Sequence, residues 1–203
     1  MQRQNVALGK HSFERKEFDA RMDPRAAIPG DDVHAGSKRK AGGFGGIAAE
    51  TARLALGIGM KVIAWNRSPR VHPGVEFLSL ERVLAESDVL SLHLLLDEET
   101  KGFLSCARIA AMKRGAILVN TARGALVDEE AMVEGLRSGH IGHAGLDVFA
   151  LEPLPAGHAL TALENVTLSA HSAFRTPEAS ENLIQAALDH CRRIVGQRRQ
   201  APG

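Results

Sequence analysis

The sequence predicts an α/β fold, in which a parallel sheet lies between helices, and three observations support this prediction. Short apolar runs that suit buried strands alternate with longer amphipathic segments that suit helices. A glycine-rich turn precedes the first of these helices, and polar residues directly follow several of the predicted strands. Because ligands bind beyond the carboxyl ends of strands in open α/β sheets, the same pattern predicts a binding site at that edge.

Length, charge and cysteine content narrow the class of protein. At 203 residues the chain can bury one sizeable core and is near the upper end for a single domain. Its 25 basic and 24 acidic residues form no basic stripe, which argues against a nucleic-acid partner. We find neither a secretory signal nor an apolar run that could span a bilayer, and expect no membrane partner. Cys106 and Cys191 lie far apart in sequence, which favours reduced thiols in a cytoplasmic protein.

Residues 1–40 differ from the rest of the chain. They are rich in Arg, Lys, Asp, Gly and Pro and show no sustained hydrophobic period, so we predict a disordered N-terminal arm. The stretch just ahead of the glycine-rich turn, residues 33–40, is too polar and too glycine-rich for a central buried strand. We therefore predict a sheet that lacks its first strand.

The glycine-rich turn at residues 42–48 reads GGFGGIA and fits the pattern G-x-G-x-x-A. Small residues allow the backbone to turn tightly and to approach a pyrophosphate at the N-terminus of the following helix. A helix is predicted at residues 47–58 and a strand at residues 61–65. This order is typical of dinucleotide binding, and the predicted cofactor-binding residues here are Gly43, Gly45, Gly46 and Ile47.

The predicted strand at residues 61–65 ends at Asn66 and Arg67. Sites that prefer NAD usually carry an acid at this point, which binds the ribose hydroxyl groups, whereas a basic residue accommodates the 2′-phosphate of NADP. Arg67 therefore makes NADP plausible. The alternative is that Arg67 and Arg70 are ordinary surface charges, and the sequence leaves NAD and NADP both open.

The remaining elements continue the alternation of strands and helices. Ser79 and Asp128 are placed to cap helices at residues 80–86 and 129–138. Pro177 opens the final helix, in which apolar residues repeat on one face. Further strands are predicted at residues 89–95, 116–119, 144–149 and 166–170, and a further helix begins at Ser105.

Three residues that can carry out chemistry follow three predicted strands: Arg123, Glu152 and His171. Arginine binds carboxylates in a bidentate pair, and a histidine beside a glutamate can transfer protons near neutral pH. Taken singly, these residues could be a solvated arginine, a loop glutamate and a structural histidine. An aspartate within a strand, Asp147, is harder to explain without a partner.

Three segments resemble the family of D-isomer-specific 2-hydroxyacid dehydrogenases: NTARG at residues 120–124, GLDVFALEP at residues 145–153, and residues 165–171. Their order and mutual spacing match the family as well. The resemblance implies a Rossmann-like, doubly wound parallel sheet and an oxidoreductase that transfers a hydride between NAD or NADP and a small 2-hydroxy or 2-keto acid. In that reaction Arg123 would hold the substrate carboxylate, His171 would exchange the proton, and Glu152 would orient His171.

The resemblance also implies further contacts with the cofactor. Asp147 would bind the nicotinamide carboxamide, and His93 is interpreted as a structural residue at a strand end. The family commonly forms homodimers through this domain, and no metal site is predicted. The positions expected to lie against the cofactor are Asn66, Arg67, Leu94, Leu95, Thr100, Thr121, Ala122, Arg123, Asp147, His171 and Ala173.

The chain also departs from the family pattern. Ala170 stands where the family usually has proline, and the substrate domain that precedes the glycine-rich turn in the family is largely absent. We therefore divide the chain into residues 1–40 outside the resemblance, a cofactor domain at 41–175, and a helix at 176–203 that returns to the substrate domain in the family.

Three hypotheses follow from these departures. The first is a dehydrogenase in which a shifted reading frame or a wrong start precedes Gly43, and which is weak or inactive as this chain alone. The second is a non-catalytic remnant that binds a dinucleotide or a partner protein. The third is a gene remnant that does not fold stably. The sequence does not say which acid would be the substrate.

Overall fold

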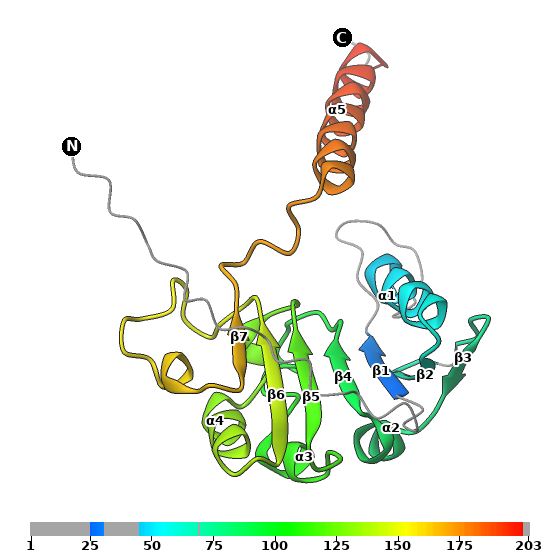
Figure 1. The fold of residues 1–203 in the computed structure, drawn as a ribbon. Coiled ribbons are helices and arrows are strands. Elements are labelled where there is room, and N and C mark those ends of the chain that lie inside the picture. The colour runs from blue at the N-terminus through cyan, green and yellow to red at the C-terminus, as the bar shows by residue number, and fades with distance from the viewer. Residues whose placement is uncertain (1–24, 31–44, 69, 201–203) are drawn as a thin grey trace.

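One parallel sheet organises the chain (Figure 1). The computed structural model describes residues 25–30, 45–68 and 70–200. Within these residues seven strands follow the order β3-β2-β1-β4-β5-β6-β7, and each strand pairs in parallel with its neighbours. The strands are β1 Arg25–Gly30, β2 Lys61–Asn66, β3 Val75–Phe77, β4 Val89–Leu92, β5 Ala116–Asn120, β6 Ile141–Leu146 and β7 Val166–Leu168. The helices are α1 Gly46–Gly57, α2 Leu80–Glu86, α3 Cys106–Ala110, α4 Glu129–Arg137 and α5 Pro177–Gln200, with 3-10 helices at Gly124–Leu126 and Ala159–Ala162.

The strand order confirms the predicted doubly wound, Rossmann-like sheet. From β1 the chain proceeds outward through β2 to β3, returns to the middle at β4, and proceeds through β5 and β6 to β7 at the other edge. The direction of winding therefore reverses between β1 and β4. In such sheets a ligand crevice lies at this reversal, beyond the carboxyl ends of the strands.

Among the described residues, two apolar clusters hold α1, α2, α3 and α4 on the sheet. The larger cluster joins β4, β5 and β6 to α2 and α4, and its most deeply buried side chains include Val83, Leu90, Leu92, Leu118 and Ile141. The smaller cluster lies under α1 and consists of Ala48, Ala52, Ala55 and Val62. Because alanine side chains are short, α1 can pack close to β2, and this fixes the start of α1 beside the crevice.

The expectation of a missing first strand is wrong. Arg25–Gly30 forms β1, which pairs with β2 along its whole length and with β4 at Ala26 and Ala27. The sequence did not predict this strand, because Pro29 and Gly30 are two of its six residues and both argue against a central strand. The pairing with β4 ends before Pro29, so the missing N–H of proline interrupts no bond on that side. The rest of the predicted disordered arm lies outside the described residues.

Several strands end earlier than predicted. β4 ends at Leu92, β6 at Leu146 and β7 at Leu168, so the predicted strand residues beyond these points belong to loops. The predicted helix caps are confirmed: the Arg82 N–H donates to Ser79 Oγ at 3.4 Å, and the Ala131 N–H donates to Asp128 Oδ1 at 3.1 Å. Strand β3 was not predicted, because three residues are too few to show a period.

Helix α5 extends away from the sheet (Figure 1). Its predicted apolar face is present but uncovered, since 71% of Leu183 and 62% of Ile184 are exposed. Among the described residues no helix is long and apolar enough to cross a membrane.

Candidate active site

A cleft of about 390 Å³ lies at the reversal of the strand order. Its walls come from the start of α1, the segment after β4 and the segment after β5. The residues that line it are Gly45, Gly46, Ile47, Ala48, His93, Leu94, Leu95, Leu96, Thr121, Ala122 and Arg123. Most of the predicted cofactor-binding residues that lie near α1, β4 and β5 are thus brought together. Gly43 lies outside the described residues.

The N-terminus of α1 is open toward this cleft. Gly45 is the N-cap residue, no side chain caps the helix, and its first turn has no acidic residue. Apart from chain neighbours and the backbone of α1 itself, no described atom lies within 4 Å of the place where a Cβ would stand on Gly45 or Gly46. The first N–H groups of a helix lack partners within it and favour anions. This end of α1 therefore fits the pyrophosphate of a dinucleotide.

The end of β2 presents a polar atom without a partner. Asn66 Nδ2 donates to the carbonyl oxygen of Ser68 at 2.7 Å, which orients the side chain amide. Asn66 Oδ1 is buried, and among the described residues it has no hydrogen-bond partner. A buried acceptor left unpaired costs free energy, which a donor such as a ribose hydroxyl would recover. Asn66 therefore fits the sugar of a nucleotide at the position predicted from sequence.

The segment after β5 is held in shape by Asn120, a residue that the sequence reasoning did not assign to the site. Asn120 is 1% exposed. Its Oδ1 accepts from the Ala122 N–H at 3.1 Å, and its Nδ2 donates to the Arg123 carbonyl at 2.9 Å. The signal in the sequence was a polar side chain directly after an apolar strand. Asn120 thereby presents Thr121 and Ala122 to the cleft.

We expect Asn120→Ala to destabilise this segment by about 2 kcal/mol, because the change leaves the Ala122 N–H and the Arg123 carbonyl without their partner. Denaturant unfolding would measure the effect. Asn165→Ala is a matched control, since Asn165 also donates to backbone carbonyls but lies away from the cleft. Equal loss of cofactor affinity in the two variants would contradict a specific role of Asn120 in shaping the cleft.

His171 and Glu152 form a close pair between two loops. His171 Nδ1 lies 2.7 Å from Glu152 Oε2, and Glu152 Oε1 accepts from the Phe149 N–H at 2.9 Å. The hydrogen bond with His171 and that from Phe149 lower the pKa of Glu152 below its usual value, and Arg123 adds a smaller effect in the same direction. Glu152 is therefore ionised near neutral pH. It orients the ring so that the other ring nitrogen, Nε2, is available to a ligand.

Asp147 anchors the loop that carries His171. Asp147 is 3% exposed and lies at the end of β6. Its Oδ1 accepts from Ser169 Oγ and from the Ser172 N–H, and its Oδ2 accepts from the Ala173 N–H. Its carbonyl also accepts from the His171 N–H at 2.9 Å. Burial raises the pKa of Asp147, but the three donors to its carboxylate outweigh burial and lower it overall.

This network keeps the His171 backbone in an unusual conformation. His171 has a φ of 48°, in the left-handed region that side chains other than glycine rarely adopt. Such a conformation persists only where the surroundings enforce it. Ala173, which is predicted to lie against a cofactor, donates its backbone N–H to Asp147.

A second cleft, of about 580 Å³, adjoins the His171–Glu152 pair. Its lining is mainly apolar and comes from Phe149, Glu152, Pro153, Leu154, Leu168, Ser169, Ala170 and His171. Gly124 directly follows Arg123, which lines the first cleft, and it contacts Phe149, which lines the second. The contact is so close that a Cβ on Gly124 would lie only 1.9 Å from the carbonyl carbon of Phe149. The loop that carries Arg123 therefore packs directly against the loop that leads to Glu152.

The segment after β4 contains two different kinds of predicted site residue. Leu94 and Leu95 line the first cleft, as expected. Thr100 does not: it is 3% exposed, its hydroxyl donates to the Leu95 carbonyl, and the same oxygen accepts from the Asp97 N–H at 2.8 Å. Thr100 therefore shapes the loop and is not among the residues that line the cleft.

His93 lines the cleft although it was interpreted as structural. Its Nε2 lies 3.0 Å from Ser91 Oγ. Burial lowers the pKa of His93 to about 4, so its imidazole is neutral near neutral pH. His93 can thus offer one hydrogen bond in the cleft but carries no charge there.

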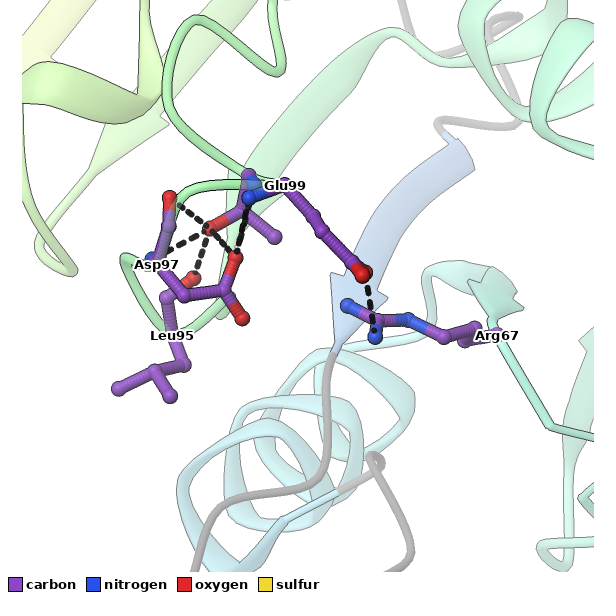
Figure 2. Close-up of polar contacts among 5 residues, drawn as sticks. Arg67, Leu95, Asp97 and Glu99 are labelled. Carbon is purple, nitrogen blue, oxygen red and sulfur yellow. Dashed lines mark hydrogen bonds and ion pairs between the residues drawn. The ribbon is translucent and has the colours of Figure 1, made fainter.

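Arg67 lies across from the segment after β4. Its Nη1 is 3.1 Å from Glu99 Oε2, and Figure 2 shows the two side chains extending toward one another. The pair joins the end of β2 to the loop after β4. Asn66 and Arg67, the two residues predicted to lie near the ribose, stand at the end of β2, as predicted from the sequence.

The sequence profile of one family matches most of the chain. It is described as "D-isomer specific 2-hydroxyacid dehydrogenase, NAD binding domain" and matches residues 6–173. The match begins well ahead of Gly43, where the motifs alone suggested that the resemblance starts.

Individual relatives agree with this family. The chain is 43% identical to a glyoxylate reductase of Aeropyrum pernix over 157 residues, which cover 71% of this chain and 47% of the relative. It is also 43% identical to a hydroxypyruvate reductase of Thermotoga maritima, over 70% of this chain and 47% of the relative. The chain thus spans about half the length of the curated relatives that it matches.

Solved structures give the same result. A D-isomer-specific 2-hydroxyacid dehydrogenase from Xanthobacter autotrophicus Py2, in complex with NADPH and MES, is 36% identical with a TM-score of 0.65, over 73% of this chain and 44% of that one. Another solved structure is an NADPH-dependent glyoxylate/hydroxypyruvate reductase from Sinorhizobium meliloti in complex with NADP and sulfate. It is 28% identical with a TM-score of 0.73, and the match covers 86% of this chain and 53% of that one.

Proposed function

Because this chain belongs to the D-isomer-specific 2-hydroxyacid dehydrogenase family, we propose that it is the cofactor-binding part of an oxidoreductase that interconverts a small 2-hydroxy acid and its 2-keto acid with NAD or NADP. The observation that carries the proposal is the His171–Glu152 pair, 2.7 Å apart, which lines the second cleft, while Arg123 and the glycine-rich turn line the first. Curated relatives named glyoxylate reductase and hydroxypyruvate reductase make glyoxylate and hydroxypyruvate the first substrates to test.

The roles of the residues follow from their chemistry. The bound nicotinamide would supply or accept the hydride. Arg123 has a guanidinium suited to a bidentate pair with the substrate carboxylate. His171 would give a proton from Nε2 to the keto oxygen during reduction and take it back during oxidation. Glu152 holds the other nitrogen of the ring and would keep the imidazole in one orientation during the transfer.

The cofactor would lie along the first cleft in this proposal. Gly45 and Gly46 would hold the pyrophosphate at the N-terminus of α1, and the ribose would donate to Asn66 Oδ1. Leu94 and Leu95 would provide apolar contact, with Thr121 and Ala122 on the facing wall. Asp147 Oδ2 accepts a hydrogen bond from the Ala173 N–H. Its second lone pair would accept from the carboxamide of the nicotinamide, as predicted.

The proposal extends to location and assembly. Both cysteines are free and exposed, which fits a reducing cytoplasm. A homodimer is proposed from the family resemblance, and the exposed apolar residues of α5 provide surface that a further domain or partner would cover.

We expect the full chain to bind NAD or NADP, with quenching of Trp65, the single tryptophan, which lies beside Asn66. Titration calorimetry would measure the affinity independently. If turnover of glyoxylate or hydroxypyruvate is present, His171→Ala should lower it by about a hundredfold or more while binding of the cofactor persists.

His158→Ala is the matched control, because His158 also pairs with a glutamate, Glu129, but lines neither large cleft. Turnover by His171→Ala equal to that of the control would contradict the catalytic role. Absence of any dinucleotide binding by the unchanged chain would contradict the whole proposal.

A second candidate function is dinucleotide binding without turnover. It is favoured by the exposure of the pair, since 41% of the His171 side chain and 35% of the Glu152 side chain are accessible, and catalysis needs a closed, dry site. Binding of the cofactor without turnover of either keto acid would support this candidate.

A further inference from the structure

The Arg67–Glu99 ion pair (Figure 2) stands next to Asn66, the residue proposed above to bind the ribose. Arg67 directly follows Asn66, whose buried Oδ1 lacks a hydrogen-bond partner among the described residues. Half of the Arg67 side chain and 77% of the Glu99 side chain are exposed. Exposed pairs of this kind stabilise a fold only slightly, so Arg67 can exchange its partner when another anion arrives.

The backbone of Glu99 is held firmly although its side chain is exposed. Asp97 Oδ1 accepts from the Glu99 N–H and from the Thr100 N–H, each at 2.9 Å. Thr100 is buried and ties the loop to the Leu95 carbonyl. Since Leu95 lines the cleft, the loop that positions Glu99 is also a wall of the site. The backbone of Glu99 is therefore fixed at a position from which its carboxylate reaches Arg67.

The carboxylates of Glu99 and Asp97 both interact with this guanidinium. The two residues belong to one acidic run, with Glu98 between them. Bonds from Thr100 are the main cause that lowers the pKa of Asp97, and the charge of Arg67 contributes in the same direction. Asp97 is thus ionised near neutral pH. A phosphate monoester, which carries close to two negative charges at neutral pH, would meet both Arg67 and these carboxylates.

We propose that Glu99 selects the cofactor at the ribose: it competes for Arg67 and repels a 2′-phosphate, and so favours NAD over NADP. The inference rests on the proposed function, because it assumes that the ribose lies at Asn66 and Arg67. Asn66 Oδ1 adds to the same preference, since it can accept from a free ribose hydroxyl but not from a phosphate that has replaced it. Without the Glu99 carboxylate, one anion that competes with the phosphate for Arg67 would be gone.

The test is the ratio of NADP to NAD affinity, measured by titration calorimetry with the full chain. Glu99→Gln should raise NADP affinity relative to NAD by about three- to fivefold, as expected for release of an exposed charge pair. The affinity for NAD should change little. The difference should shrink at high salt, because exposed charges are screened. Adenosine 2′,5′-bisphosphate against adenosine 5′-monophosphate gives the same comparison without the nicotinamide.

Glu98→Gln is the matched control, because it removes the same charge from the adjacent position of the same loop. Its effect on the ratio should be smaller than that of Glu99→Gln. In the background of Arg67→Ala, Glu99→Gln should lose most of its effect, since the partner for which it competes is gone.

The outcomes separate this inference from the proposed function. Dinucleotide binding with an unchanged ratio in Glu99→Gln, or with a change equal to that of Glu98→Gln, overturns the selector role and leaves the proposed function standing. Failure of the unchanged chain to bind NAD, NADP or either adenosine nucleotide overturns both. An increased ratio that depends on Arg67 supports the proposal.

Discussion

Gly124→Ala is expected to lower the free energy of unfolding by about 3 kcal/mol, because the added methyl group collides with backbone that cannot move aside. The Cβ would lie 1.9 Å from the Phe149 carbonyl carbon and 2.4 Å from the Ala150 nitrogen. The strain would also reach the candidate active site, because the Phe149 N–H donates to Glu152, which pairs with His171. Denaturant unfolding gives the change in stability.

Gly145→Ala is the control for Gly124→Ala. Gly145 lies in β6, and no described atom is within 4 Å of the place of its Cβ. Its replacement should change stability by no more than about 0.5 kcal/mol. Similar unfolding free energies for the two variants would mean that the Arg123 and Glu152 loops do not pack in contact at Gly124.

Asp147→Ala should destabilise the chain by about 3 to 5 kcal/mol, because it leaves the donors Ser169, Ser172 and Ala173 without their charged acceptor. The loop that carries His171 would lose the contacts that hold its backbone at a φ of 48°. We therefore expect increased amide hydrogen exchange at residues 171–173, beyond the global loss of stability. Protection of these amides as strong as in the unchanged chain would contradict the role of Asp147 as the anchor.

The contribution of Asp147 should also depend on pH. Its folded-state pKa lies below the usual value of 3.8, so the ionised carboxylate stabilises the fold above that value. This contribution is lost as pH falls through the lowered pKa. Asp147→Asn has no titrating group, so its stability deficit should be largest above about pH 4 and should shrink at lower pH. A deficit that stays constant from pH 6 to about pH 3 would show that the carboxylate is not the stabilising species.

Local patterns were sufficient for much of the fold. The strands at residues 61–66 and 116–120 and the helices capped by Ser79 and Asp128 were predictable, because each depends on neighbours within a few residues. The same holds for the order of Arg123, Glu152 and His171 after successive strands. β1 was missed because its six residues include proline and glycine, and only the neighbouring strands make it a strand.

The sequence by itself determined the alternation of strands and helices and the glycine-rich start of α1, since period and capping are local properties. The doubly wound order and the candidate catalytic residues came from the resemblance of three motifs to a family. Only the tertiary structure decided which of these polar groups already have hydrogen-bond or ion-pair partners within the chain. Asp147 finds its donors 22 to 26 residues later, and Arg67 finds Glu99 32 residues later. Such pairings arise where the ends of separate strands meet at one edge of the sheet, and the distance along the chain carries no trace of them.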